Sequence, residues 1–153
     1  MNGFARALAP CVLVLGCACA SPLFPPRLAD CGGPLPAVAA IPGGDFVLRE
    51  QARFSGGEVD VALDLLAERR GDRLVLVAFD AFGTRVFSVV QRGSEVEEDS
   101  PMGRALAVPP GNALRDWYAA RELGPEAGDR VEVRRPGCDY RAIFVRVSYR
   151  ALD

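Results

Sequence analysis

The longest regular pattern in this chain is the alternation of apolar and mostly polar residues between Glu58 and Glu68. Successive side chains of a β-strand point to opposite faces of the sheet, so a period of two predicts a long strand with one buried face. Such a strand suits an antiparallel sheet that is covered on one face only. The apolar positions of the pattern are Val59, Val61, Leu63, Leu65 and Ala67.

Turn residues divide the rest of the sequence into further strands. Gly56 and Gly57 predict a hairpin turn between the long strand and the one before it. Residues 73–79 are apolar at both sets of alternate positions, as in a central strand. In the last segment the alternation places Val145 and Val147 on the buried face. The expected strands are residues 46–54, 58–68, 73–79, 84–92, 95–98, 130–135 and 143–151.

One helix is predicted, at residues 112–123. Asn112 follows a proline-glycine break and suits an N-cap, while Gly124 and Pro125 form a stop signal. Trp117 and Tyr118 give this helix an aromatic face. The sum is a mainly β (α+β) domain at residues 45–153. We expect a curved antiparallel sheet, or incomplete β-barrel, with the helix over its concave face.

The chain contains neither histidine nor lysine, so all 18 of its basic residues are arginine. Histidine is the usual general base near neutral pH and the commonest metal ligand in proteins. A Ser-His-Asp or Cys-His site, or a Schiff-base lysine, is therefore excluded. We expect no enzyme activity, no metal and no cofactor. The net charge of −2 gives no electrostatic reason to expect a nucleic-acid partner.

Residues 1–16 have the pattern of a bacterial signal peptide, with an apolar run too short to span a bilayer. The run Val14-Leu15-Gly16-Cys17 resembles a lipobox, which predicts a diacylglycerol anchor on Cys17. No aspartate follows this cysteine, and that favours the outer membrane as the destination. The alternative is ordinary signal cleavage after Ala20, which would leave a soluble periplasmic protein.

Residues 17–44 are rich in proline, glycine and alanine and show no periodicity. This composition predicts an extended tether between the anchor and the domain. Cys31 and Cys138 lie outside the signal region, and in an oxidising periplasm they are candidates for a disulfide. Cys19 is an alternative partner for either of them.

Residues 73–87 form an apolar strand, a small-aromatic-glycine turn at Ala81-Phe82-Gly83, and a strand that begins with polar residues. This layout resembles the LolA/LolB-like lipoprotein-carrier fold. It is more similar still to a family of bacterial outer-membrane lipoproteins of that fold found in aryl-polyene gene clusters. Residues 108–118, which run from an apolar segment into the helix, resemble it too. The resemblance covers roughly residues 45–149.

The resemblance implies an incomplete β-barrel that holds acyl chains beneath a helical lid, and a membrane-inserting residue at Phe82. We therefore expect an outer-membrane lipoprotein that binds an acyl chain or lipid-like molecule and aids lipid or lipoprotein localisation. The alternative is a structural or accessory lipoprotein of an envelope complex, with a filled core and no ligand. The expected cavity-lining residues are Val59, Val61, Leu63, Leu65, Val86, Val145, Val147 and Trp117.

Overall fold

The computed structural model describes residues 25–103, 106–122, 124 and 128–153. Over these residues the chain forms a seven-stranded antiparallel sheet with strand order β5-β4-β3-β2-β1-β7-β6, together with the helix α1 and a short 3-10 helix η1. The predicted mainly β fold with a helix is thus confirmed. The elements are η1 (Val38–Ala40), β1 (Phe46–Gly56), β2 (Val59–Arg70), β3 (Arg73–Phe79), β4 (Arg85–Arg92), β5 (Glu95–Asp99), α1 (Pro110–Ala120), β6 (Arg130–Val133) and β7 (Arg141–Ala151).

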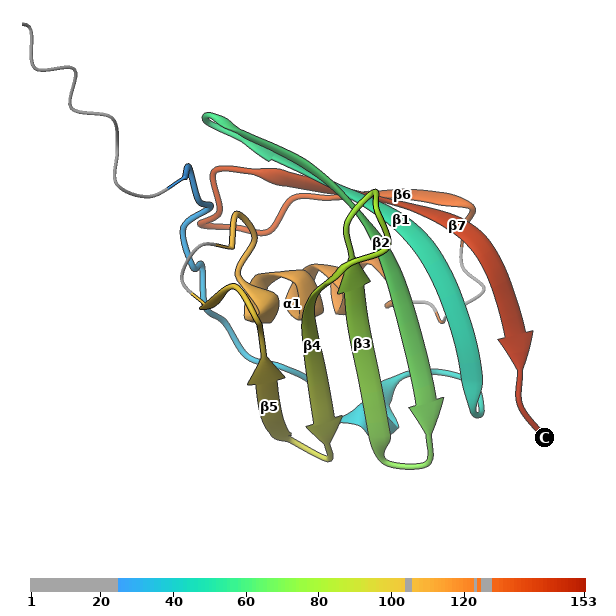
Figure 1. The fold of residues 1–153 in the computed structure, drawn as a ribbon. Helices are drawn as coiled ribbons and strands as arrows, with labels where there is room; N and C mark the ends of the chain where they lie inside the picture. Colours follow the sequence, from blue (N-terminus) through green and yellow to red (C-terminus); the bar gives the residue numbers. More distant parts are fainter. Residues whose placement is uncertain (1–24, 104–105, 123, 125–127) are drawn as a thin grey trace, which may run out of the picture.

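The sheet curves around α1, which lies on its inner face (Figure 1). Alternate residues of β1 to β4 point toward the helix and are buried, as the period of two predicts. Trp117 of α1 is fully buried and stacks on Phe46 of β1 at a centroid distance of 6.3 Å. The helix begins two residues earlier than predicted, because Pro110 occupies its first turn and has a backbone angle already suited to a helix.

Strand β7 corrects the predicted facing of Val145 and Val147. These residues are 38% and 58% exposed, whereas Ala142 and Phe144 are buried. The pairing with β1 shifts between Arg49 and Glu50, so that Val147 is skipped as the extra residue of a β-bulge. A bulge reverses the facing of every residue beyond it. The sequence prediction assumed an unbroken alternation along β7. Because the bulge interrupts it, the prediction gave the wrong face to the residues before Val147.

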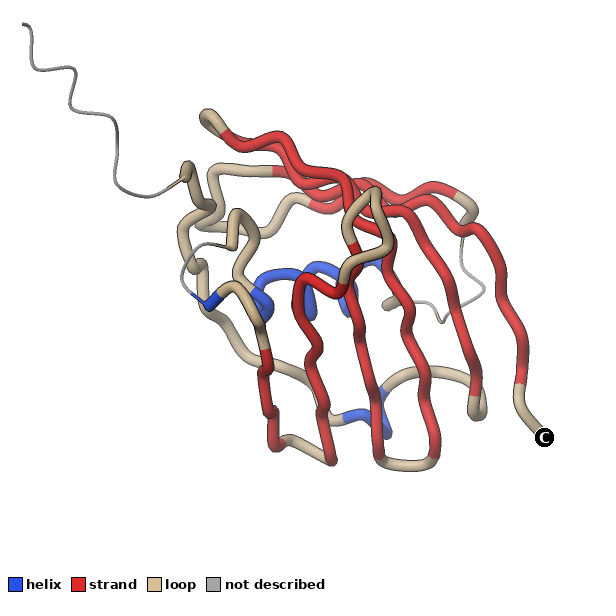
Figure 2. Tube along the Cα trace, viewed as in Figure 1, coloured by secondary structure: helices blue, strands red, loops and turns tan. Residues whose placement is uncertain are grey.

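Residues 25–44, which we call the strap, correct the prediction of a free tether at residues 17–44. The strap crosses α1 and the end of the sheet before it enters β1, and apart from η1 it is loop (Figures 1 and 2). Leu28, Val38 and Ile41 are buried in the core. Backbone hydrogen bonds join Leu28 N to Ala107 O at 2.8 Å and Val38 N to Gly93 O at 3.1 Å. The structured domain therefore begins before residue 45.

Gly56, at the end of β1, lies directly against Tyr140. A Cβ atom built on Gly56 would lie 2.5 Å from Tyr140 Cβ and 2.9 Å from Tyr140 Cα. We expect Gly56→Ala to lower the free energy of unfolding by about 1–3 kcal/mol, as overpacking does. Urea unfolding measures this change. The matched control is Gly44→Ala, since a Cβ there meets nothing within 4 Å. An equal effect of the two substitutions would contradict the close contact.

Candidate functional site

An apolar pocket opens where β2 parts from β3. Strand β2 begins at Val59 but pairs with β3 only from Asp64 onward, because β3 ends at Phe79. The first residues of β2 pair with β1 alone, and the resulting wedge is bounded by the segment that follows β5. This end pocket has a volume of about 400 Å³. Its lining includes Val61, Leu63, Val86, Phe87, Met102 and Leu106, with carboxylates at Asp60 and Asp80.

The turn between β3 and β4 holds Phe82 in water beside this pocket. The Asp80 carboxylate accepts hydrogen bonds from the backbone N–H groups of Phe82 and Thr84, both at 2.9 Å. Gly83 has a φ of 78°, which completes the tight turn without strain. Phe82 is 94% exposed, and Met102, which lines the end pocket, is 54% exposed. Two large apolar side chains therefore face solvent at this end of the sheet.

The two carboxylates of the end pocket already have partners. Asp80 holds the turn, and Arg53 Nε donates to Asp60 Oδ1 at 2.7 Å. The hydrogen bond from Arg53 lowers the pKa of Asp60, so this group stays ionised near neutral pH. The lowered pKa of Asp60 is opposite to the raised pKa that a general acid needs. The pocket is thus suited to holding an apolar group rather than to proton transfer.

The predicted cavity-lining residues do not form one cavity. Val61, Leu63 and Val86 meet in the end pocket, where Val86 lies at an irregularity of the β3–β4 pairing. Val59, Leu65 and Trp117 are buried in the core between sheet and helix. Val145 and Val147 lie on the outer face of the sheet, for the reason given above. The predicted lining residues are all apolar, but the tertiary structure places them in three different environments: the end pocket, the core and the outer face.

A buried ion pair in the core was missed by the sequence analysis. Glu50 of β1 pairs with Arg121, which follows α1, and both side chains are almost fully buried. Trp117 Nε1 donates to the other Glu50 oxygen at 2.8 Å. Burial lowers the pKa of Arg121 to about 10, and Arg146 adds to this effect, yet the guanidinium remains charged at neutral pH. The sequence did carry one signal for this ion pair: Glu50 lies in a predicted strand at a position that the alternation with Leu48 and Ala52 places on the buried face.

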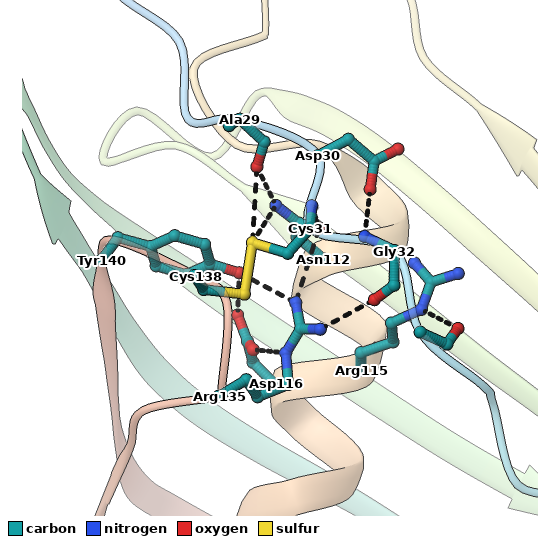
Figure 3. A network of polar contacts seen from close by, with 11 residues as sticks. Ala29, Asp30, Cys31, Gly32, Asn112, Arg115, Asp116, Arg135, Cys138 and Tyr140 are labelled. Atoms are coloured by element: carbon teal, nitrogen blue, oxygen red, sulfur yellow. Dashed lines mark hydrogen bonds and ion pairs between the residues drawn. A yellow bond between two sulfur atoms is a disulfide. The ribbon is translucent and has the colours of Figure 1, made fainter.

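A second polar cluster surrounds a disulfide between Cys31 and Cys138, the two cysteines named as candidates (Figure 3). Tyr140 donates its hydroxyl hydrogen to Asp116 at 2.6 Å, and Arg135 forms an ion pair with the same carboxylate. Arg135 Nη1 also donates to the strap carbonyl of Gly32 at 2.9 Å. Burial raises the pKa of Asp116, while its two partners oppose the shift. Every polar group here has a structural partner, so the cluster fastens the strap.

Comparisons with known proteins add no relatives: no family model matches the chain, and no curated protein matches it in sequence. In the described part of the chain, no group of three or more acidic, cysteine or histidine side chains is placed to hold a metal ion. Among the described helices, none has the length and apolar character needed to cross a bilayer. The apolar lining of the end pocket and the exposed side chains of Phe82 and Met102 make this end of the sheet the candidate functional site.

Proposed function

We propose that this protein is an outer-membrane lipoprotein whose domain binds an acyl chain or lipid-like molecule in the end pocket. The observation that carries the proposal is the apolar pocket of about 400 Å³ beside Phe82, which is 94% exposed. Ligand pockets are typically concave, mostly apolar and several hundred Å³ in volume. The lipid anchor at Cys17, which lies outside the described residues, would hold this domain close to its ligand.

The place of binding differs from the one that the LolA/LolB-like resemblance implies. Those carriers hold acyl chains against the concave face of the sheet. Here α1 covers that face, and the fully buried Trp117 packs on Phe46. An acyl chain would instead enter beside Val61 and Val86, which are half-buried. Insertion of Phe82 into lipid would gain about 1.5–3 kcal/mol and bring the pocket mouth to the membrane surface.

The second candidate is an accessory lipoprotein of an envelope complex that holds no ligand. The specific observation in its favour is the filled inner face: Leu74, Leu76, Leu114 and Trp117 are all buried members of one continuous core. This candidate leaves the end pocket without a role. It also attributes exposed Phe82 and Met102 to a protein contact rather than to a lipid.

Native mass spectrometry of the full-length protein, exported in a bacterial host and released in mild detergent, separates the two candidates. We expect adducts of lipid or fatty-acid mass that disappear under denaturing conditions. Val61→Trp fills the end pocket and should weaken the adduct about tenfold, a loss of about 1.4 kcal/mol of binding. Val147→Trp adds the same bulk on the outer face and should leave the adduct unchanged. Protein that remains free of adducts after incubation with lipid vesicles would favour the accessory role.

A further inference from the structure

A second and larger pocket lies between the strap and the outer side of α1. This strap pocket has a volume of about 570 Å³, and apolar groups make up most of its lining. The strap contributes three proline rings and Ile41, and the helix contributes Tyr118 and Ala119. Tyr118 donates its hydroxyl hydrogen to Gln91 Oε1 at 2.8 Å, and burial raises its pKa to about 12. The ring is therefore fixed and neutral.

Three arginines line the strap pocket, and two of them are already paired with buried carboxylates. Arg121 is paired with Glu50, and Arg135 is paired with Asp116. For Arg115, in contrast, no carboxylate lies within ion-pair distance in the described residues. Arg115 acts on the Asp116 carboxylate only at longer range, so among the three it is the arginine left to form an ion pair with a ligand.

The Arg115 guanidinium is held in place without being neutralised. Its Nε donates to the strap carbonyl of Gly33 at 2.8 Å (Figure 3). Gly33 has a φ of 106°, a conformation that disfavours any other residue there. Gly111 leaves room for Nη1, since a Cβ on Gly111 would lie 2.8 Å from it. The same Cβ atom added to Gly111 would lie 3.0 Å from Glu98 Oε1. The guanidinium is therefore oriented by the strap, and among the described residues its terminal nitrogens form no hydrogen bond or ion pair.

We propose that the strap pocket binds a monocarboxylate with an apolar body, whose carboxylate pairs with Arg115 and whose body lies against the strap prolines, Ile41 and Tyr118. An arginine matches a carboxylate with two parallel N–H donors. Glu122 also lines the pocket and Glu98 lies nearby, so the local charge disfavours a dianion such as a phosphate ester. This site is separate from the end pocket and does not depend on the function proposed above.

Isothermal titration of the full-length protein with octanoate, below its micelle concentration, tests the proposal. We expect saturable binding that Arg115→Gln weakens about tenfold, as loss of a charge-assisted hydrogen bond does. Ala119→Trp, which fills the pocket, should abolish it. Glu98→Gln removes a competing negative charge and should strengthen binding. The matched control Arg92→Gln removes an exposed arginine of β4 outside the pocket lining and should have no effect.

Two further measurements make the result specific. Octanol, which lacks the charge, should bind more weakly than octanoate to protein that retains Arg115 and should not distinguish Arg115→Gln from it. Octanoate is itself an acyl chain and can also enter the end pocket, so the titrations use a Val61→Trp background that fills that pocket; saturable binding should persist there. The proposal is overturned if octanoate does not bind, if Arg92→Gln and Arg115→Gln act equally, or if Val61→Trp rather than Ala119→Trp removes binding. Each result is independent of whether lipid adducts form at the end pocket.

Discussion

Replacing Cys31 and Cys138 with serine should lower the free energy of unfolding by about 3–5 kcal/mol, a large share of the stability of a domain this size. The disulfide joins residues separated by 107 positions, with their Cα atoms 5.6 Å apart. A cross-link over such a long loop removes much conformational freedom from the unfolded chain, and its stabilising effect grows with loop length.

The same substitution should also loosen the strap in the folded state. The strap carbonyls of Ala29 and Gly32 accept hydrogen bonds from Asn112 and Arg135 at 2.7 and 2.9 Å. These contacts are short-range and depend on the strap staying close to α1. Hydrogen exchange should therefore rise first at the strap amides and only later in the sheet.

Urea unfolding of Cys31→Ser/Cys138→Ser, compared with the wild-type protein in the presence and absence of reductant, measures the effect. Reduced wild-type protein should match the double variant. Cys19→Ser is the control, because Cys19 lies outside the described residues and the structure pairs the other two cysteines. A loss of stability in Cys19→Ser as large as in the double variant would identify Cys19 as a disulfide partner and contradict the structure.

The strands of the sheet could be predicted from the sequence because alternation and turn residues are patterns of neighbouring residues along the chain. Alternation from Val59 to Ala67 reports which side chains face the core, and the glycine turns mark where strands end. The face of Val145 was not predictable in the same way. The bulge at Val147 comes from pairing with β1, and a period counted along one strand contains no information about its partner's register.

The strap and the site show a second limit of local patterns. Leu28, Val38 and Ile41 are buried, yet their spacing follows no period because an extended chain is fitted residue by residue onto a surface that other segments build. The end pocket combines Val61 with Val86 and Leu106, which only the ending of β3 brings together. Composition supplied the correct residue types for a pocket, while their separation into pocket, core and outer face required the tertiary structure.

Removing the charge of Glu50 alone should be nearly as damaging as loss of the disulfide. We expect Glu50→Gln to lower the free energy of unfolding by about 3–5 kcal/mol, because it leaves the Arg121 guanidinium buried without its counter-charge. Arg146, which already acts on Arg121 through its positive charge, would make the loss worse. Glutamine keeps an oxygen that can accept the hydrogen bond from Trp117 Nε1, so the effect reports on charge rather than on this contact.

Removing both charges of the Glu50–Arg121 pair should destabilise the protein far less than removing one of them. Glu50→Gln combined with Arg121→Met removes both charges, keeps an acceptor for Trp117 and fills the space of the arginine stem. Because two ions lose their hydration when they are buried together, we expect this double variant to unfold within about 1 kcal/mol of the wild-type protein. A double-mutant cycle in urea, with Arg121→Met as the other single variant, gives the coupling energy directly. A double variant as unstable as Glu50→Gln would show that the arginine stabilises the core through contacts other than its charge.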